Sequence, residues 1–186
     1  MTASPGPNNA MVAVSGANYG LRRTLPHILG VAVGFPAMLV LVALGAAEVV
    51  RDSPGLQVAM RWVGGLWLLW IAWRIAVAVP ASAGAAAGPR RGRPMTFLEA
   101  ALFQGVNPKA WLLAFGGAGA YVGVGGWAAA VALGLLFAAM AVVCLAAWAA
   151  LGAGMAQQLL RPAAMRWFNR VVALLLVVSV LPILAR

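Results

Sequence analysis

The feature that most constrains the fold is an uncharged stretch of 51 residues, from position 110 to position 160. A helix needs about 20 apolar residues to cross a membrane, so this stretch holds two membrane helices and a turn. We expect the turn at the glycine–tryptophan boundary formed by Gly125, Gly126 and Trp127. Hydrophobic residues make up 64% of the chain and charged residues 9%, and the mean hydropathy is +0.95. The sequence therefore predicts an all-α integral membrane protein.

Apolar segments along the rest of the chain bring the expected number of membrane helices to six. The opening segment, residues 5–20, has 16 residues, and a helix of that length reaches about 24 Å of a hydrocarbon core of about 30 Å. It is expected to be incomplete, so that it either tilts and thins the bilayer or lacks residues upstream of Met1. The other helices are expected at residues 28–47, 56–79, 97–122 and 167–184, with one more after the turn. Arg61 and Arg74, inside the third helix, are expected to reach the membrane surface.

The positive charges gather on one side of the membrane if the six helices alternate in direction. The net charge of +10 would suggest nucleic acid in a soluble chain, but here the charges sit at helix ends and report topology. The residues on the basic side are Arg22, Arg23, Arg74, Arg90, Arg91, Arg93, Arg161, Arg166 and Arg170. We therefore expect the arginine-rich loops in the cytoplasm, both termini outside, and no nucleic acid partner.

A hydrophilic linker at residues 80–95 separates two parts of three helices each, residues 1–79 and 96–186. An odd number of crossings per part reverses the second part in the membrane, so the two are expected to form an inverted repeat. The tetrapeptide Ala59-Met60-Arg61-Trp62 recurs as Ala164-Met165-Arg166-Trp167, at the start of the third and of the sixth helix. Chance in an alanine-rich chain is the alternative, and four consecutive matches that include Met and Trp weigh against it.

Each half also contains a proline-asparagine motif in an apolar setting: Ser4-Pro5-Gly6-Pro7-Asn8-Asn9 and Gln104-Gly105-Val106-Asn107-Pro108-Lys109. Proline and glycine break a helix, and the freed backbone groups are tolerated at membrane depth only where protein or water satisfies them. Aligning Pro7 with Pro108 also matches Gly16 with Gly117. We expect two broken helices that line a cavity. The alternative is a pair of packing kinks whose amides the protein itself satisfies.

The groups in these two motifs suit an amino acid as ligand. Helix N-termini carry positive partial charge and favour a carboxylate, while side-chain amides both donate and accept hydrogen bonds. The residues expected to bind substrate are Pro5, Gly6, Pro7, Asn8, Asn9, Gln104, Asn107, Pro108 and Lys109. Lys109 is the one charge deep in a span, and a cation there is expected to face protein, water or the substrate carboxylate. Snorkelling to an interface is the alternative for this lysine.

Glu99 is the acidic residue best placed for proton coupling, because it lies at the cytoplasmic start of the fourth helix, about ten residues or 15 Å before Lys109. The alternative is a solvated charge near the positive end of a helix dipole. His27 is expected at the membrane surface and Cys144 in apolar packing. One histidine and three scattered acids do not make a metal cluster or a catalytic site. We therefore expect no enzyme activity, no metal and no cofactor.

Two pairs of glycines are spaced for close packing between helices. Gly30 and Gly34 form such a pair in the second helix, and Gly119 and Gly123 form one near the end of the fourth. Small residues four positions apart let two helix backbones approach, either within one subunit or between two. The pattern therefore leaves a homo-oligomer open.

The same motifs resemble those of a known family, the LysE/RhtB amino-acid exporters. The resemblance rests on the opening Pro5-Gly6-Pro7-Asn8-Asn9, on Gly20-Leu21-Arg22-Arg23-Thr24, on residues 103–111 and on the closing Arg166-Trp167-Phe168-Asn169-Arg170. It implies efflux of amino acids or close derivatives across the bacterial cytoplasmic membrane, driven by the proton gradient. The closing region looks most like the cysteine and O-acetylserine exporters. The chain departs from the family at its start, where members place an apolar run before the first motif.

These features together predict an exporter of a small amino acid, whose partners are that substrate and the lipid bilayer. Alternating access would come from one half rocking against the other. The competing interpretation is a non-transporting membrane scaffold or assembly factor with the same fold, in which the two breaks are only kinks.

Overall fold

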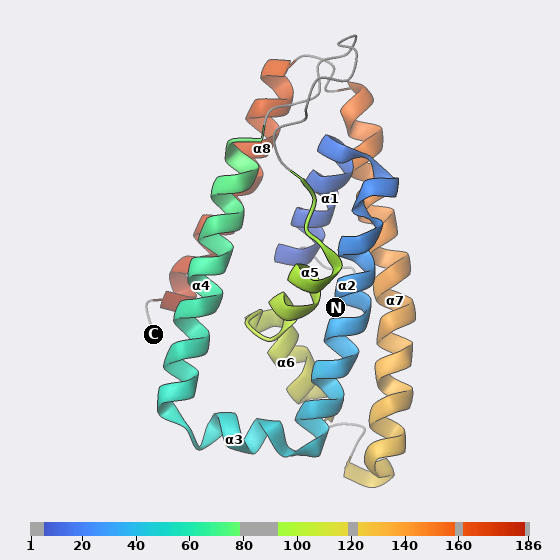
Figure 1. Ribbon diagram of the computed structural model, residues 1–186, viewed down its shortest axis with the longest axis vertical. Coiled ribbons are helices and arrows are strands. Elements are labelled where there is room, and N and C mark those ends of the chain that lie inside the picture. The colour runs from blue at the N-terminus through green and yellow to red at the C-terminus, as the bar shows by residue number, and fades with distance from the viewer. Residues whose placement is uncertain (1–5, 79–92, 119–122, 159–161, 185–186) are drawn as a thin grey trace. The chain divides into compact units, whose positions relative to one another are not determined.

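The computed structural model describes residues 6–78, 93–118, 123–158 and 162–184, and every regular element within these ranges is a helix (Figure 1). The elements are α1 (Pro7–Tyr19), α2 (Leu21–Leu41), the π-helical turn η1 (Val42–Ala46), α3 (Ala47–Arg51), α4 (Pro54–Ala76), α5 (Phe97–Gln104), α6 (Pro108–Gly117), α7 (Gly123–Gln158) and α8 (Pro162–Leu184). The prediction of an all-α protein is confirmed. Most of the predicted linker lies outside the described residues, as does Pro5 of the first motif.

Four helical segments are long and apolar enough to cross a membrane: Leu21–Ala46, Pro54–Ala76, Gly126–Met155 and Ala163–Leu181. They coincide with the second, third, fifth and sixth expected helices, and they make the chain a multi-pass membrane protein. The other two expected helices are shorter in the structure. Helix α1 has 13 residues, and the fourth expected helix is divided into α5 with 8 and α6 with 10. The total of six spans therefore stays a prediction.

Two glycines with positive φ bend the chain where long helices meet their neighbours. Gly126 has φ 58° and ψ −150° and interrupts the first turns of α7, so the turn predicted at the glycine–tryptophan boundary is confirmed. Gly45 has φ 101° inside η1, at the bend between α2 and α3. Residues with a Cβ atom rarely adopt such angles, whereas glycine does so without steric cost. These two positions therefore separate membrane-length helices from short connecting ones.

The described residues form two compact units, which are considered separately below. Unit 1 contains residues 26–64, 96–118 and 123–144, and unit 2 contains residues 6–25, 65–78, 93–95, 145–158 and 162–184. Each unit takes segments from both sides of the predicted linker. The units are therefore not the predicted repeat halves, and the boundaries of those halves stay a prediction.

In unit 1, α2 packs directly on the backbone of α5 through its two glycines. A Cβ atom on Gly34 would lie 2.6 Å from the Cα of Ala101, and one on Gly30 would overlap the carbonyl oxygen of Phe97. The small-residue pair predicted from the sequence thus packs two helices of the same chain. Gly119 of the second pair lies outside the described residues.

Below this contact, unit 1 has an apolar core between α2, η1 and α6. Its buried members are Phe35, Met38, Leu39, Val42, Ala110 and Ala114, and Trp111, Leu113, Ala118, Leu133 and Phe137 pack around them. The rings of Phe35 and Phe137 meet edge to face at 5.2 Å, a favoured aromatic geometry. Because Ala110 and Ala114 both follow Pro108 on α6, this core fixes the half-helix that follows the second motif.

In unit 2, α1 is buried on all sides along most of its length, from Met11 to Asn18. Its partner is the last part of α7, where the two backbones touch. A Cβ atom on Gly16 would lie 2.9 Å from the Cα of Ala149, and one on Gly152 would overlap the carbonyl oxygen of Ala13. A helix that is hydrophobic and buried all round lies in the interior of a protein. Helix α1 is therefore an interior helix, packed on the last part of α7.

The end of α4 in unit 2 is tied to the segment that precedes α5. Arg74 donates from Nη2 to the carbonyl oxygen of Arg93 at 2.7 Å. Its guanidinium also lies 4.6 Å from the ring centre of Trp70, a cation–π arrangement. Arg74 thus lies at the end of its helix, bonded to a backbone carbonyl and stacked on an aromatic ring. This is the arrangement expected for a basic residue that reaches a membrane surface.

Candidate functional site

The second proline-asparagine motif forms a break between two helices. Helix α5 ends at Gln104 and α6 begins at Pro108. Asn107 is the N-cap of α6, and its Oδ1 accepts a hydrogen bond from the backbone N–H of Lys109 at 3.1 Å. Trp111 donates from its indole Nε1 to the carbonyl oxygen of Gly105 at 2.8 Å. The predicted break at this motif is confirmed, and side chains of the same segment satisfy part of its freed backbone.

Two side-chain amides at this break are buried and held in place. Asn107 is 2% exposed and Gln104 is 1% exposed. Gln104 donates from Nε2 to the carbonyl oxygen of Ala100 at 2.8 Å, while Asn107 is fixed by its cap bond. Buried amides with fixed orientations can recognise a polar ligand, and they can equally serve as internal caps. Their predicted role in substrate binding stays a prediction.

The first motif begins helix α1 in a different way. Gly6 is the N-cap, with an extended backbone and no side chain that could cap, and Pro7 is the first helical residue. The carbonyl oxygen of Gly6 accepts from the N–H of Ala10 at 3.0 Å. Asn8 is half-buried and Asn9 is buried. Both asparagines therefore lie within the first turn of α1, after the proline.

The residues predicted to bind substrate are distributed over both units. Gly6 to Asn9 belong to unit 2, and Gln104 to Lys109 belong to unit 1. In unit 2 these residues lie at the start of α1, and in unit 1 they lie between the end of α5 and the start of α6. A single site bounded by both motifs stays a prediction.

The two charged residues predicted near the second motif both have local roles. Glu99 accepts from the N–H of Thr96 at 2.8 Å, and Thr96 Oγ1 accepts from the N–H of Glu99 at 3.2 Å. This reciprocal pair is a capping box, which closes the start of α5. The half-buried Lys109 is the second residue of α6, and its N–H binds the cap of that helix. The predicted roles of Glu99 in proton coupling and of Lys109 in binding stay predictions.

A buried amide pair that the sequence analysis missed connects α1 with α8. Asn18 donates from Nδ2 to Oδ1 of Asn169 at 2.9 Å, and Asn169 donates back to Oδ1 of Asn18 at 3.2 Å. Asn18 also donates to the carbonyl oxygen of Val14 at 2.9 Å. Polar residues within apolar helices are expected to pair across helices. That rule, applied to every asparagine inside an expected membrane helix, would have marked both residues.

A second buried polar contact joins α1 to the start of α2. The hydroxyls of Ser15 and Thr24 lie 2.9 Å apart, and Thr24 Oγ1 also donates to the carbonyl oxygen of Gly20 at 3.0 Å. Gly20 has φ 81° and separates the two helices. The positive φ and the two hydroxyls together fix the corner between α1 and α2.

His27 differs from its predicted interfacial role, because its side chain is buried in the protein with 1% exposure. Neither ring nitrogen has a hydrogen-bond partner among the described residues. Within the described ranges, the one other buried side-chain nitrogen without a partner is Nε1 of Trp67, which does not titrate.

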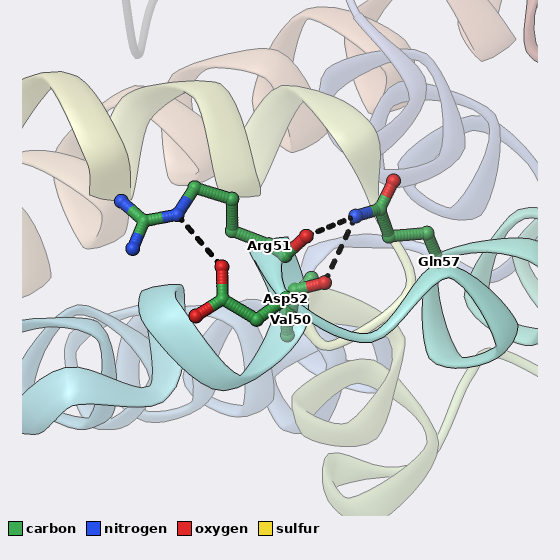
Figure 2. Close-up of polar contacts among 4 residues, drawn as sticks. All are labelled: Val50, Arg51, Asp52 and Gln57. Carbon is green, nitrogen blue, oxygen red and sulfur yellow. Dashed lines mark hydrogen bonds and ion pairs between the residues drawn. The ribbon is translucent and has the colours of Figure 1, made fainter.

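The connection between α3 and α4 carries an exposed polar cluster (Figure 2). Arg51 donates from Nε to Oδ1 of Asp52 at 3.1 Å, and this bond raises the pKa of Arg51. Gln57 donates from Nε2 to the carbonyl oxygens of Val50 and Arg51, at 3.0 and 2.8 Å. Asp52 thus neutralises the charge of Arg51. Exposed pairs add little to stability, so this cluster shapes a turn and does not form a site.

No group of three or more histidine, cysteine or acidic side chains occurs within the described ranges. Cys144 is half-buried in α7 and forms no disulfide there. The candidate site therefore consists of helix starts, buried amides and two charged residues, rather than of metal ligands or nucleophiles.

Comparison with curated proteins finds relatives with a shared name. The chain is 36% identical over 107 residues to a cysteine/O-acetylserine efflux protein of Klebsiella pneumoniae, a match that covers 57% of this chain and 52% of the relative. Proteins of the same name from Salmonella typhimurium and Escherichia coli K12 are 30% and 28% identical over 106 residues, with the same coverage. The match thus spans about half the length of these relatives. No solved structure matches the chain significantly.

Comparison with protein families covers almost the whole chain. The family described as LysE type translocator matches residues 1–183. Both proline-asparagine motifs, the amide pair of α1 and α8, and all four membrane-length helices fall within this range. The chain belongs to the LysE type translocator family.

Proposed function

We propose that the protein exports a small amino acid or a close derivative from the cytoplasm. The observation that supports this most strongly is the match of the LysE type translocator family over residues 1–183. The names of the curated relatives make cysteine and O-acetylserine the first substrates to test. The cell inner membrane is the proposed location and the proton gradient the proposed driving force.

The proposed architecture is six membrane helices in two inverted halves, with α1 as the short first span and α5 plus α6 as the broken fourth. Helices α4 and α8 support this pairing, because each has 23 residues, begins with a proline and carries the repeated tetrapeptide near its start. Within unit 2, α8 runs opposite to the last part of α4 (Figure 1). Opposite directions are what an inverted repeat requires of its third and sixth helices.

We place substrate recognition at the starts of α1 and α6. Both helices begin with a proline at their first position, where the helix dipole offers positive partial charge to a carboxylate. The buried amides of Asn9 and Asn107 lie at these starts. Lys109 would add a positive charge at the start of α6. Amides and a cation together suit a zwitterionic amino acid better than an apolar ligand.

The alternative is a membrane scaffold whose breaks are only kinks. The cap bond of Asn107 and the bond from Trp111 to Gly105 favour it, because satisfied backbone groups are what a purely structural kink needs. The two functions differ in what Asn107 must do: a scaffold needs only its capping oxygen, whereas an exporter also uses its amide toward substrate.

The test is transport by the purified protein in liposomes. Radiolabelled cysteine or O-acetylserine should exchange across the membrane against unlabelled substrate inside, and empty liposomes should show no exchange. Cells that overproduce the chain should also release these compounds into the medium. If no compound of an amino-acid panel is exchanged or released, the scaffold is the better description.

A substitution at Asn107 separates the two functions further. Serine caps a helix about as well as asparagine, so Asn107→Ser should keep the break but lose the amide. An exporter that uses this amide should lose exchange activity while the protein inserts and unfolds normally. Full activity of Asn107→Ser would confine this residue to capping.

A further inference from the structure

We propose that His27 is the group that binds the coupled proton during export, with the carboxylate of Glu99 as its counter-charge. This inference rests on the proposed export function and adds the residue through which the proton gradient acts. It is drawn from the burial of His27 on the face of α2 that carries the glycine contacts with α5, and from its lack of hydrogen-bond partners among the described residues.

The helix geometry directs His27 toward α5. His27, Gly30 and Gly34 are spaced three and seven residues apart, so they share one face of α2. Both glycines contact the backbone of α5. His27 therefore lies on the packed face, one turn before the first of these contacts, and its 1% exposure agrees with that placement.

The chemistry of the buried ring points to a proton site. A neutral imidazole has one nitrogen that donates and one that accepts, and both are buried here without a partner among the described residues. Burying such groups is unfavourable, and an apolar side chain would fill the same space at no such cost. The accepting nitrogen has a lone pair that can take up a proton, which would turn the ring into an imidazolium.

The surrounding charges identify the counter-charge. On α5, the helix that packs against this face, the charged residue is Glu99. It lies between Phe97 and Ala100, which an added Cβ on Gly30 would meet. On α2 itself, Arg22 and Arg23 are exposed. The capping box holds the Glu99 carboxylate at the start of α5, in the part of that helix that Gly30 contacts. A proton bound at His27 would thus form an ion pair across the α2–α5 contact, and its release would dissolve that pair.

The experiment compares two kinds of transport in liposomes for the wild type and His27→Leu. Substrate exchange at equal pH on both sides measures transport alone, and accumulation driven by a pH gradient measures coupling. We expect gradient-driven accumulation by His27→Leu to fall to the level seen without a gradient, while exchange persists. If His27→Leu keeps gradient-driven accumulation, the inference is wrong and the export function stands. If the wild type shows no exchange, the export function itself fails.

Two variants at the start of α5 separate charge from structure. Glu99→Gln removes the charge but keeps a residue that completes a capping box, so gradient-driven accumulation should fall. Thr96→Ala breaks the box and keeps the carboxylate, so coupling should persist even if the helix start is weakened. Normal coupling in Glu99→Gln would remove Glu99 from the proposal.

The wild-type protein offers a direct measurement that does not depend on variants. The chain contains one histidine, so ring nitrogens labelled with ¹⁵N report on His27 alone, provided that the affinity tag contains no histidine. The ring signals should change between neutral and protonated forms over the pH range in which the gradient drives transport, and substrate should alter that change. A ring that stays neutral throughout this range would overturn the proposal.

Discussion

The starts of α1 and α6 have nearly the same composition and use it differently. In α6 the asparagine precedes the proline, and the side-chain oxygen of Asn107 caps the helix by accepting a hydrogen bond from the N–H of Lys109. In α1 the two asparagines follow the proline, and Gly6 at the cap has no side chain to contribute. The order of asparagine and proline therefore decides whether the asparagine side chain caps the helix or lies within its first turn. It follows that the two motifs are not interchangeable, although each places a proline at the first position of its helix.

The largest effect is expected from the glycines that the repeat alignment pairs, Gly16 in α1 and Gly117 in α6. A Cβ on Gly16 meets the backbone of Ala149, which cannot move aside, whereas one on Gly117 meets only the side-chain ends of Leu133 and Leu39, at 3.3 and 3.4 Å. Gly16→Ala should destabilise the protein by about 3 kcal/mol or more, the upper range of overpacking. Gly117→Ala should be tolerated. Thermal unfolding in detergent measures both.

Gly116 is a control for the comparison of Gly16→Ala with Gly117→Ala, because an added Cβ there meets nothing within 4 Å. Gly116→Ala should unfold like the wild type. Equal losses for Gly16→Ala and Gly117→Ala would show that the close packing of α1 is not special.

A smaller effect is expected from the cap of α6. Asn107→Ala removes the acceptor for the N–H of Lys109 and should cost about 1 to 2 kcal/mol, whereas Asn107→Ser should cost much less. Gly6→Ser at α1 supplies a capping hydroxyl where none exists and should raise stability slightly. If Asn107→Ala and Asn107→Ser unfold at the same temperature, the cap bond does not stabilise the break.

The amide pair of α1 and α8 should contribute somewhat less. Double-mutant cycles on hydrogen bonds in membranes average about 0.6 kcal/mol and reach about 1.7. Asn18→Ala and Asn169→Ala should each destabilise unit 2, and the double variant should cost less than the sum of the two, because they lose the same bonds. Strictly additive losses would mean that the pair does not interact.

The smallest effect is expected at the exposed pair of Arg51 and Asp52, which lies outside both helix starts. Their side chains are 71% and 69% exposed, and salt screens such pairs. Arg51→Gln should leave the unfolding temperature and substrate exchange unchanged. A loss of exchange would give the α3–α4 connection a role that its geometry does not suggest.

The parts of the fold that depend on local rules could be predicted from the sequence. Apolar runs of sufficient length gave the four membrane helices, the glycines near Trp127 gave the turn, and Pro108 gave the break before α6. These features depend on residues close in sequence. The capping role of Asn107 follows from equally local rules, although this residue was predicted to bind substrate.

The parts that depend on distant residues could not be predicted. Asn18 and Asn169 are 151 positions apart, and neither shows from its neighbours which amide it will meet. His27 follows two exposed arginines, which suggested a membrane surface, yet the contact of Gly30 with α5 buries its ring. Helix periodicity shows which residues share a face of a helix, whereas tertiary packing decides whether lipid, water or another helix contacts that face.

The amide pair between α1 and α8 has a consequence for biosynthesis. Asn18 leaves the ribosome 151 residues before Asn169, which at bacterial rates of about 5 to 20 residues per second is a wait of roughly 8 to 30 s. During that time Asn18 can bond only within α1, to the carbonyl oxygen of Val14, and its side-chain oxygen waits for the amide of Asn169. Insertion of the last helix therefore completes the polar contacts of the first one.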